Sequence, residues 1–135
     1  MKVIADTGGI IALLDSTDKN HSAVVNVVSH LELLIPATIL AEVDYLVTKY
    51  LGELAARIFL EDVTTGAFTY LASDLLDMSQ TLKIMTRYSD IPIGFVDASI
   101  AALADRHKIQ RILTLDRRHF HTIRSESFDH FILLP

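Results

Sequence analysis

Two aspartates directly follow short apolar runs of the chain. Asp6 comes after residues 3–5, and Asp116 comes after residues 111–115. Such runs are typical of buried parallel strands, and open α/β sheets bind their ligands at the carboxyl ends of parallel strands. Both carboxylates are therefore candidates for one shared site. Each also has a simpler explanation, Asp6 as the N-cap of the next helix and Asp116 as a turn residue.

Two further acidic residues lie in segments with helical spacing. Glu42 shares a helical face with Ile39 and Leu46, which predicts that it points inward or along the border of that face. Glutamates in such places are uncommon unless they are paired or bind a ligand, and an ion pair with a basic residue remains the alternative. Asp97 stands at the start of a helix, where it could equally be an N-cap.

If these four carboxylates converge, their chemistry is limited by mutual repulsion. Several carboxylates within a few ångströms repel strongly, so some of them stay protonated unless a cation lies between them. Oxygen ligands of this kind suit Mg²⁺ or Mn²⁺ and do not suit Zn²⁺. A divalent ion held by carboxylates can activate water and neutralise charge during phosphodiester hydrolysis, which is the reaction that the four residues indicate.

The elements that must position these residues alternate along the chain. The expected strands are residues 2–5, 33–35, 68–71, 111–115 and 131–133. The expected helices are residues 10–14, 18–30, 37–50, a segment after Gly52 that includes 54–59, 74–87 with Ser73 as its cap, and 97–107. This alternation predicts an α/β fold, a three-layer α/β/α sandwich with a central, mostly parallel sheet of about four to five strands. We expect a single domain over residues 1–135.

The composition limits the class of protein. Of the 135 residues, 50% are hydrophobic and 21% are charged, which is typical of a globular domain with a buried core. The absence of cysteine excludes disulfides and thiolate metal sites and is typical of a reducing compartment. No apolar run approaches the roughly 18 to 20 residues of a membrane span, and the first strand leaves no room for a signal peptide. We therefore expect a soluble, cytoplasmic protein without a membrane partner.

The charge is unevenly distributed, although the formal net charge is −5. Six of the twelve basic side chains lie within residues 106–124, together with three of the six histidines. A solvated surface is the simpler explanation of this cluster. A basic strip on an acidic protein would also steer an anionic substrate. The cluster alone does not decide between these explanations.

Four short segments around the acidic residues resemble the four signatures of the PIN-domain ribonucleases. These segments are Asp6-Thr7 after a strand, Ala41-Glu42-Val43 after Pro36, residues 96–102 around Asp97, and residues 114–120 around Asp116. They occur in the family's order and the resemblance covers the whole chain. The chain is most similar to the VapC-type toxins of bacterial and archaeal toxin–antitoxin pairs.

The resemblance implies roles for individual residues. It makes Asp6, Glu42, Asp97 and Asp116 the catalytic, metal-binding quartet for one or two Mg²⁺ or Mn²⁺ ions, with Thr7 and Thr114 as supporting hydroxyls. Many relatives carry another acidic residue soon after the fourth, whereas here the neighbours are Arg117, Arg118 and His119. These three could contact substrate, although a surface position is the simpler explanation of His119. The resemblance further implies an RNA substrate, a homodimer and a cognate antitoxin.

Other functions remain open from the sequence. The chain could be a housekeeping PIN nuclease in RNA processing, or a catalytically silent module whose acidic pocket is structural or binds a basic peptide. A phosphatase or phospho-acceptor domain is a further alternative, but the Asp-x-Asp pair that such phosphatases use is missing, since Thr7 and Gly8 follow Asp6. A metal-dependent endoribonuclease is the leading hypothesis.

Overall fold

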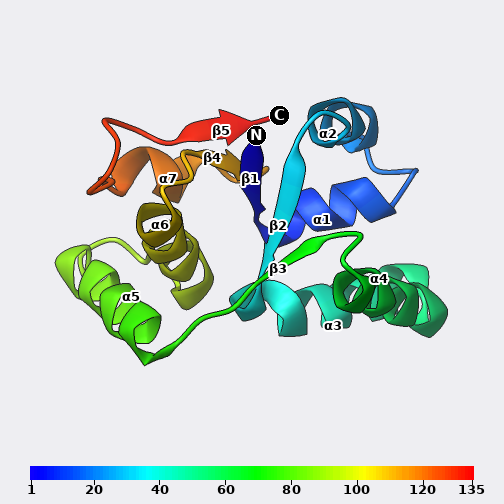
Figure 1. The fold of residues 1–135 in the computed structure, drawn as a ribbon, viewed down its shortest axis with the longest axis horizontal. Helices are drawn as coiled ribbons and strands as arrows, with labels where there is room; N and C mark the ends of the chain where they lie inside the picture. Colours follow the sequence, from blue (N-terminus) through cyan, green and yellow to red (C-terminus); the bar gives the residue numbers. More distant parts are fainter.

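A five-stranded parallel sheet forms the centre of the molecule in a computed structural model that describes all 135 residues (Figure 1). The strand order is β3-β2-β1-β4-β5, and every neighbouring pair is parallel. The strands are β1 (Lys2–Ala5), β2 (Glu32–Pro36), β3 (Thr69–Leu71), β4 (Arg111–Leu113) and β5 (Ile132–Leu134). The expected sheet is confirmed, and it is entirely parallel.

Helices cover the sheet in two groups. The helices are α1 (Thr7–Leu14), α2 (His21–Val28), α3 (Leu40–Leu51), α4 (Glu53–Thr65), α5 (Leu75–Arg87), α6 (Phe95–His107) and α7 (Arg118–Thr122), with a 3₁₀ turn η1 (Ala37–Ile39) before α3. In one group α1 packs on α2 and α3, and α3 packs on α4. In the other group α6 packs on α5 and α7. Figure 1 shows α1 and α2 on one side of the sheet and α5, α6 and α7 on the other, which confirms the three-layer sandwich.

The central strands are apolar because both faces of the sheet are covered. Ile4 pairs in register with Leu34 on one side and with Ile112 on the other, and all three side chains are buried. Helix α6 lies so deep that every residue from 98 to 105 is buried. The core is therefore continuous through the sheet, and the polar groups of the strands emerge at their carboxyl ends.

The pairing of β1 with β4 brings the segment around Asp6 next to the segment around Asp116. The backbone N–H of Asp6 donates to the carbonyl oxygen of Leu113 over 2.8 Å, which extends the pairing one residue beyond β1. On the other side of β4, the N–H of Thr114 donates to the carbonyl oxygen of Leu134 over 2.9 Å. Asp6 and Thr114 thus become neighbours across 108 residues of sequence.

Several local expectations were wrong. Ser73 does not cap α5, because Asp74 occupies that position and forms a capping box with Asp77. Helix α6 begins at Phe95 with Gly94 as its N-cap, so Asp97 lies in the first turn and is not a cap. The sequence analysis missed α7 altogether, since five residues are too few to show a helical period.

None of the helices is both long and apolar enough to span a membrane.

Candidate metal-binding site

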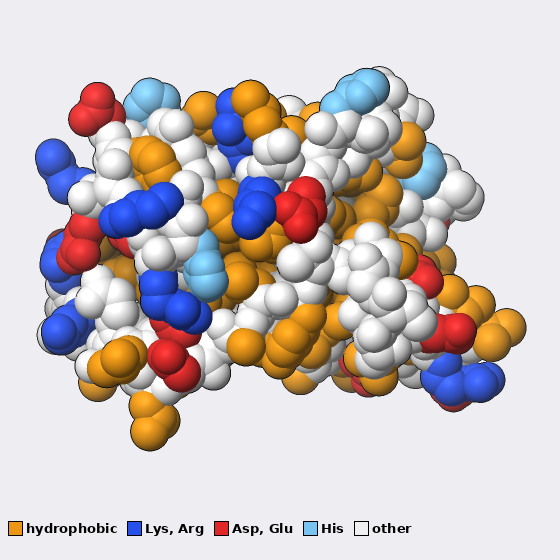
Figure 2. Space-filling view, viewed as in Figure 1, with side chains coloured by type: hydrophobic (Ala, Val, Ile, Leu, Met, Phe, Trp, Pro, Cys, Tyr) orange, Lys and Arg blue, Asp and Glu red, His pale blue; other side chains and the backbone are white.

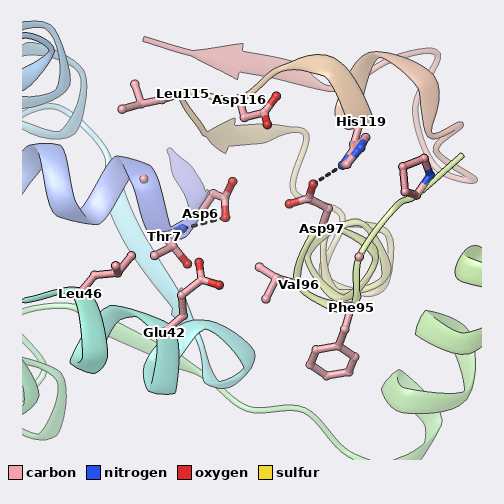
Figure 3. A pocket seen from close by; sticks show the side chains of 13 residues that line it. Asp6, Thr7, Glu42, Leu46, Phe95, Val96, Asp97, Leu115, Asp116 and His119 are labelled. Carbon is pink, nitrogen blue, oxygen red and sulfur yellow. Dashed lines mark hydrogen bonds and ion pairs between the residues drawn. The ribbon is translucent and has the colours of Figure 1, made fainter.

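An open groove of about 750 Å³ lies where β1 and β4 end. Its floor and walls come from four parts of the chain that are far apart in sequence. The lining residues are Asp6, Thr7, Gly8, Glu42, Leu46, Pro92, Gly94, Phe95, Val96, Asp97, Leu115, Asp116 and His119. The structure therefore brings all four predicted carboxylates to one groove (Figure 3).

Asp6 is the most enclosed of the four carboxylates. Asp6 as a whole is only 9% exposed. Its Oδ1 accepts a hydrogen bond from the backbone N–H of Thr7 over 2.7 Å, and its Oδ2 accepts one from the Thr114 hydroxyl over 2.9 Å. Burial, and then the nearby carboxylates of Asp97 and Glu42, raise the pKa of Asp6 from 3.8 to about 6, although both hydrogen bonds oppose this. Asp6 also caps α1, which confirms the expected cap, and it lines the same groove as the other three carboxylates.

The two threonine hydroxyls next to Asp6 differ in their partners. Thr114 is fully buried, and its hydroxyl oxygen also lies 3.0 Å from the carbonyl oxygen of Asp116 and accepts that residue's N–H over 3.2 Å. Thr7 is 4% exposed, and its hydroxyl has no hydrogen-bond partner. Because a buried polar atom without a partner costs about 1–3 kcal/mol, the Thr7 hydroxyl is a feature that a ligand in the groove would explain.

Asp97 faces Asp6 from the first turn of α6. Its Oδ2 lies 2.6 Å from Nδ1 of His119, and only about a fifth of either side chain is exposed. In Figure 3 the other carboxylate oxygen of Asp97 points toward Asp6. His119 is therefore not the surface histidine that the sequence suggested, because it is half-buried and bound to a predicted metal ligand.

Glu42 is exposed, so of the two expected placements, pointing inward or lying along the border of the apolar face, the structure shows the second. It lies in the first turn of α3, at the border where that helix meets the groove, and Figure 3 shows its carboxylate turned toward Asp6. No basic partner binds it, so the alternative of an ion pair does not apply. Asp44, two positions further along the same helix, is also exposed.

Asp116 is the predicted ligand whose two carboxylate oxygens are both engaged by an arginine. Arg118 donates to it from Nε to Oδ1 over 3.0 Å and from Nη2 to Oδ2 over 2.8 Å. This fork, with the Arg118 backbone N–H, lowers the pKa of Asp116 from 3.8 to about 2. Asp116 lines the same groove, whereas the carboxylates that raise the pKa of Asp6 most are Asp97 and then Glu42.

The donor atoms of these residues suit a divalent cation, although the side chains are not spaced to surround one. No three Asp, Glu or His side chains surround a single point in the structure. The donors that face one another are nevertheless all oxygens, the set that Mg²⁺ and Mn²⁺ prefer. Helices α1, α3 and α6 all begin at the groove, and their N-terminal partial charges favour the acidic groups there. The buried, protonation-prone Asp6 and the unpartnered Thr7 hydroxyl are the observations that fit a cation.

The basic segment does not form a free basic strip. Arg106 binds Asp77 at 2.6 Å, Lys108 donates to Ser127, and Arg117 binds the carbonyl oxygen of Pro135. Figure 2 shows basic and acidic side chains intermixed over α5, α6 and α7. Most of these basic side chains are thus exposed and engaged by partners within the chain, which agrees with the simpler explanation of a solvated surface.

The groove also has members that the sequence analysis did not identify. Leu46, Phe95 and Leu115 supply apolar lining beside the carboxylates. Phe95 immediately precedes the segment around Asp97, and Leu115 lies next to Asp116 within its segment, so proximity to these aspartates was the available signal. The link from His119 to Asp97 had no such signal, because it depends on the position of α7.

The fold and this arrangement of carboxylates define a class of protein. Residues 3–125 match the family model of the PIN domain, and the chain belongs to the PIN-domain family.

Particular relatives place the chain within that family. It is 34% identical over 135 residues to Ribonuclease VapC26 of Mycobacterium tuberculosis, covering 98% of this chain and 100% of the relative. The crystal structure of VapC20 from the same species, titled a Sarcin-Ricin loop cleaving toxin, superposes with a TM-score of 0.78 at 19% identity, covering 86% of this chain and 91% of that one. A DNA-bound VapBC structure from Salmonella typhimurium superposes with a TM-score of 0.71 at 19% identity, over 98% and 96% of the two chains. The two structural likenesses show that the fold is shared.

Proposed function

We propose that this protein is a Mg²⁺- or Mn²⁺-dependent endoribonuclease that acts as the toxin of a type II toxin–antitoxin pair. The observation that carries the proposal is the buried carboxylate of Asp6, whose pKa is raised to about 6 beside Asp97 and Glu42 in an open groove. Membership of the PIN-domain family and 34% identity to a named ribonuclease support the choice of RNA as substrate.

The chain's own residues divide the work of the site. Asp6 and Asp97 would hold the ion, and Glu42 would bind it directly or through water. A divalent ion bound there supplies positive charge that stabilises a phosphodiester under attack and activates water. Thr114 fixes the orientation of Asp6 through its 2.9 Å hydrogen bond, and the Thr7 hydroxyl is free to bind a water or an ion in the groove.

The number of ions depends on Asp116 in this proposal. Asp6, Asp97 and Glu42 offer oxygens for one ion, whereas Asp116 becomes available only when Arg118 releases it. The assignment of Arg117 and Arg118 as substrate contacts stays a prediction. Of these two, Arg118 binds Asp116, which lines the groove, and it would be free to bind a phosphate once Asp116 binds an ion instead.

The proposed partners are a cognate antitoxin and a second copy of the chain. Solved structures of similar fold include toxin–antitoxin complexes from Klebsiella pneumoniae and Salmonella typhimurium, which supports an antitoxin partner. The homodimer is proposed from the family resemblance alone.

The proposal is tested by cleavage of a structured RNA with purified protein and Mn²⁺. We expect Asp6→Asn and Asp97→Asn to lower the cleavage rate at least about 100-fold, because each removes a charge that the ion and the transition state need. Cleavage should also stop when EDTA removes the ion.

Asp44→Asn is the matched control, since Asp44 is an exposed carboxylate on α3 that does not line the groove. It should cleave at the wild-type rate. Undiminished cleavage by Asp6→Asn, or cleavage in EDTA, would overturn the assignment and leave an activity that does not use this metal site. No cleavage by the wild-type protein with Mn²⁺ would instead leave a silent binding module.

A further inference from the structure

His119 makes a contact that the proposed reaction does not by itself require. Its Nδ1 lies 2.6 Å from Oδ2 of Asp97, and the two side chains come from α7 and α6, 22 positions apart. Only 22% of the His119 side chain and 20% of the Asp97 side chain are exposed. The contact is therefore well shielded from water, unlike the largely exposed pair of Arg118 and Asp116.

We propose that His119 is a positioning residue, which holds one oxygen of Asp97 so that the other faces Asp6 and the ion between them. This inference rests on the proposed metal site. It replaces the substrate contact suggested for His119 by the sequence.

The hydrogen-bonding chemistry of the two groups assigns the donor. A carboxylate that binds a cation is ionised, and it can only accept hydrogen bonds. Nδ1 of His119 must therefore carry the hydrogen and donate it to Oδ2 of Asp97. The remaining oxygen of Asp97 has no hydrogen-bond donor, and Figure 3 shows it pointing toward Asp6. An aspartate held in this way cannot turn away from the ion without breaking a charge-assisted hydrogen bond.

The backbone that carries His119 is itself fixed. The next residue, Phe120, is 2% exposed and packs edge-on against Phe131, with ring centroids 6.4 Å apart. The carbonyl oxygen of His119 accepts the N–H of Ile123, a buried residue, over 2.8 Å. Helix α7 also contacts α6 directly. The imidazole thus starts from a rigid support, which a positioning residue needs.

The test is the affinity for Mn²⁺, measured by the loss of the free-ion EPR signal in the absence of RNA. His119→Phe keeps a planar ring of similar size but removes the donor. Removing a hydrogen-bond partner of a metal ligand typically weakens metal affinity about 10- to 100-fold. We expect a rise of that size in the Kd for Mn²⁺, with a matching fall in RNA cleavage at low Mn²⁺ that high Mn²⁺ partly restores.

Two further variants separate positioning from folding. His119→Asn places an amide N–H close to the position of Nδ1, so it should recover most of the wild-type affinity. His121→Phe changes an exposed histidine of the same short helix and should leave the Kd unchanged. Thermal unfolding of each variant without Mn²⁺ shows whether the fold is intact.

The outcomes distinguish this inference from the proposed function. If wild-type protein binds Mn²⁺ and folded His119→Phe binds it equally well, His119 does not position Asp97, and the nuclease proposal stands. If His119→Asn binds as weakly as His119→Phe, restoring the hydrogen-bond donor does not restore the affinity, and the positioning proposal is wrong. If wild-type protein binds no Mn²⁺ and Asp6→Asn changes nothing, both proposals fall together.

Discussion

Asp6 has three structural roles at once. It ends a buried strand, caps helix α1 and faces two other carboxylates in the groove. Burial and like charge make its ionised form unfavourable, and the hydrogen bonds from Thr7 and Thr114 offset only part of this. A residue whose charge opposes folding is a candidate for function, because the fold alone would be better served by a neutral side chain.

This reasoning gives a prediction for stability without divalent ions. The pKa of Asp6 is about 6 in the folded chain and 3.8 in the reference state, so the folded state holds the proton more tightly. That stabilisation is complete below about pH 4 and is lost as the pH rises through 6. Asp6→Asn avoids the loss, and we expect it to raise the free energy of unfolding by about 1–3 kcal/mol at pH 7.5 and by almost nothing at pH 4.

Urea unfolding in EDTA at the two pH values measures this difference. Asp44→Asn, which alters an exposed carboxylate, should leave the free energy of unfolding unchanged at both. A variant Asp6→Asn that is less stable than wild type at pH 7.5 would show that the hydrogen bonds of Asp6 outweigh its burial.

At the scale of elements, the close packing of α1 on β4 sets the distance between Asp6 and the Asp116 loop. Gly9 permits this approach, because a Cβ atom at that position would lie 2.7 Å from Cγ and 3.1 Å from the carbonyl oxygen of Leu113. At Gly8, one residue earlier in the same helix, a Cβ would lie 3.7 Å from the nearest atom, Cβ of Leu115. The two adjacent glycines therefore have different roles.

We expect Gly9→Ala to lower the free energy of unfolding by about 1–3 kcal/mol, since the backbone of β4 cannot move aside cheaply. Gly8→Ala is the control and should leave stability unchanged or raise it by up to about 1 kcal/mol, because alanine favours the helix. Thermal unfolding of the two variants measures both effects. Equal stability of the two would show that α1 can shift away from β4 without loss.

At the scale of the whole molecule, the proposed homodimer and the proposed antitoxin complex can both be tested by the mass of the species in solution. Sedimentation velocity should give a species of twice the 15.0 kDa of the chain at micromolar concentration. Adding the product of a small reading frame next to this gene should give a heavier complex and inhibit RNA cleavage. A single 15.0 kDa species, or cleavage that the added protein does not affect, would contradict the respective partner.

The elements were largely predictable because their signals are local. Strand β1, the break at Gly52 and the helix later found as α5 follow from short apolar runs, a glycine and a helical period. The cap of α5 was misplaced by one residue, because Ser73 and Asp74 are both good caps and only the hydrogen bonds of Asp74 decide between them. Helix α7 is too short to show a helical period in the sequence, so it was not predicted, and His119, which it carries, was wrongly expected at the surface.

The sequence by itself determined the class of fold, because strand ends and apolar runs fix where parallel strands bring side chains together. The resemblance to the PIN-domain ribonucleases singled out the four carboxylates that the structure brings to one groove. The sequence could not determine what each carboxylate contacts. Only the tertiary structure showed that Asp6 is buried, that His119 binds Asp97 and that Arg118 donates hydrogen bonds to the carboxylate of Asp116. The physical reason is that hydrogen bonds and pKa values depend on distances between segments that are remote in sequence, such as Asp6 and Thr114, and only packing sets those distances.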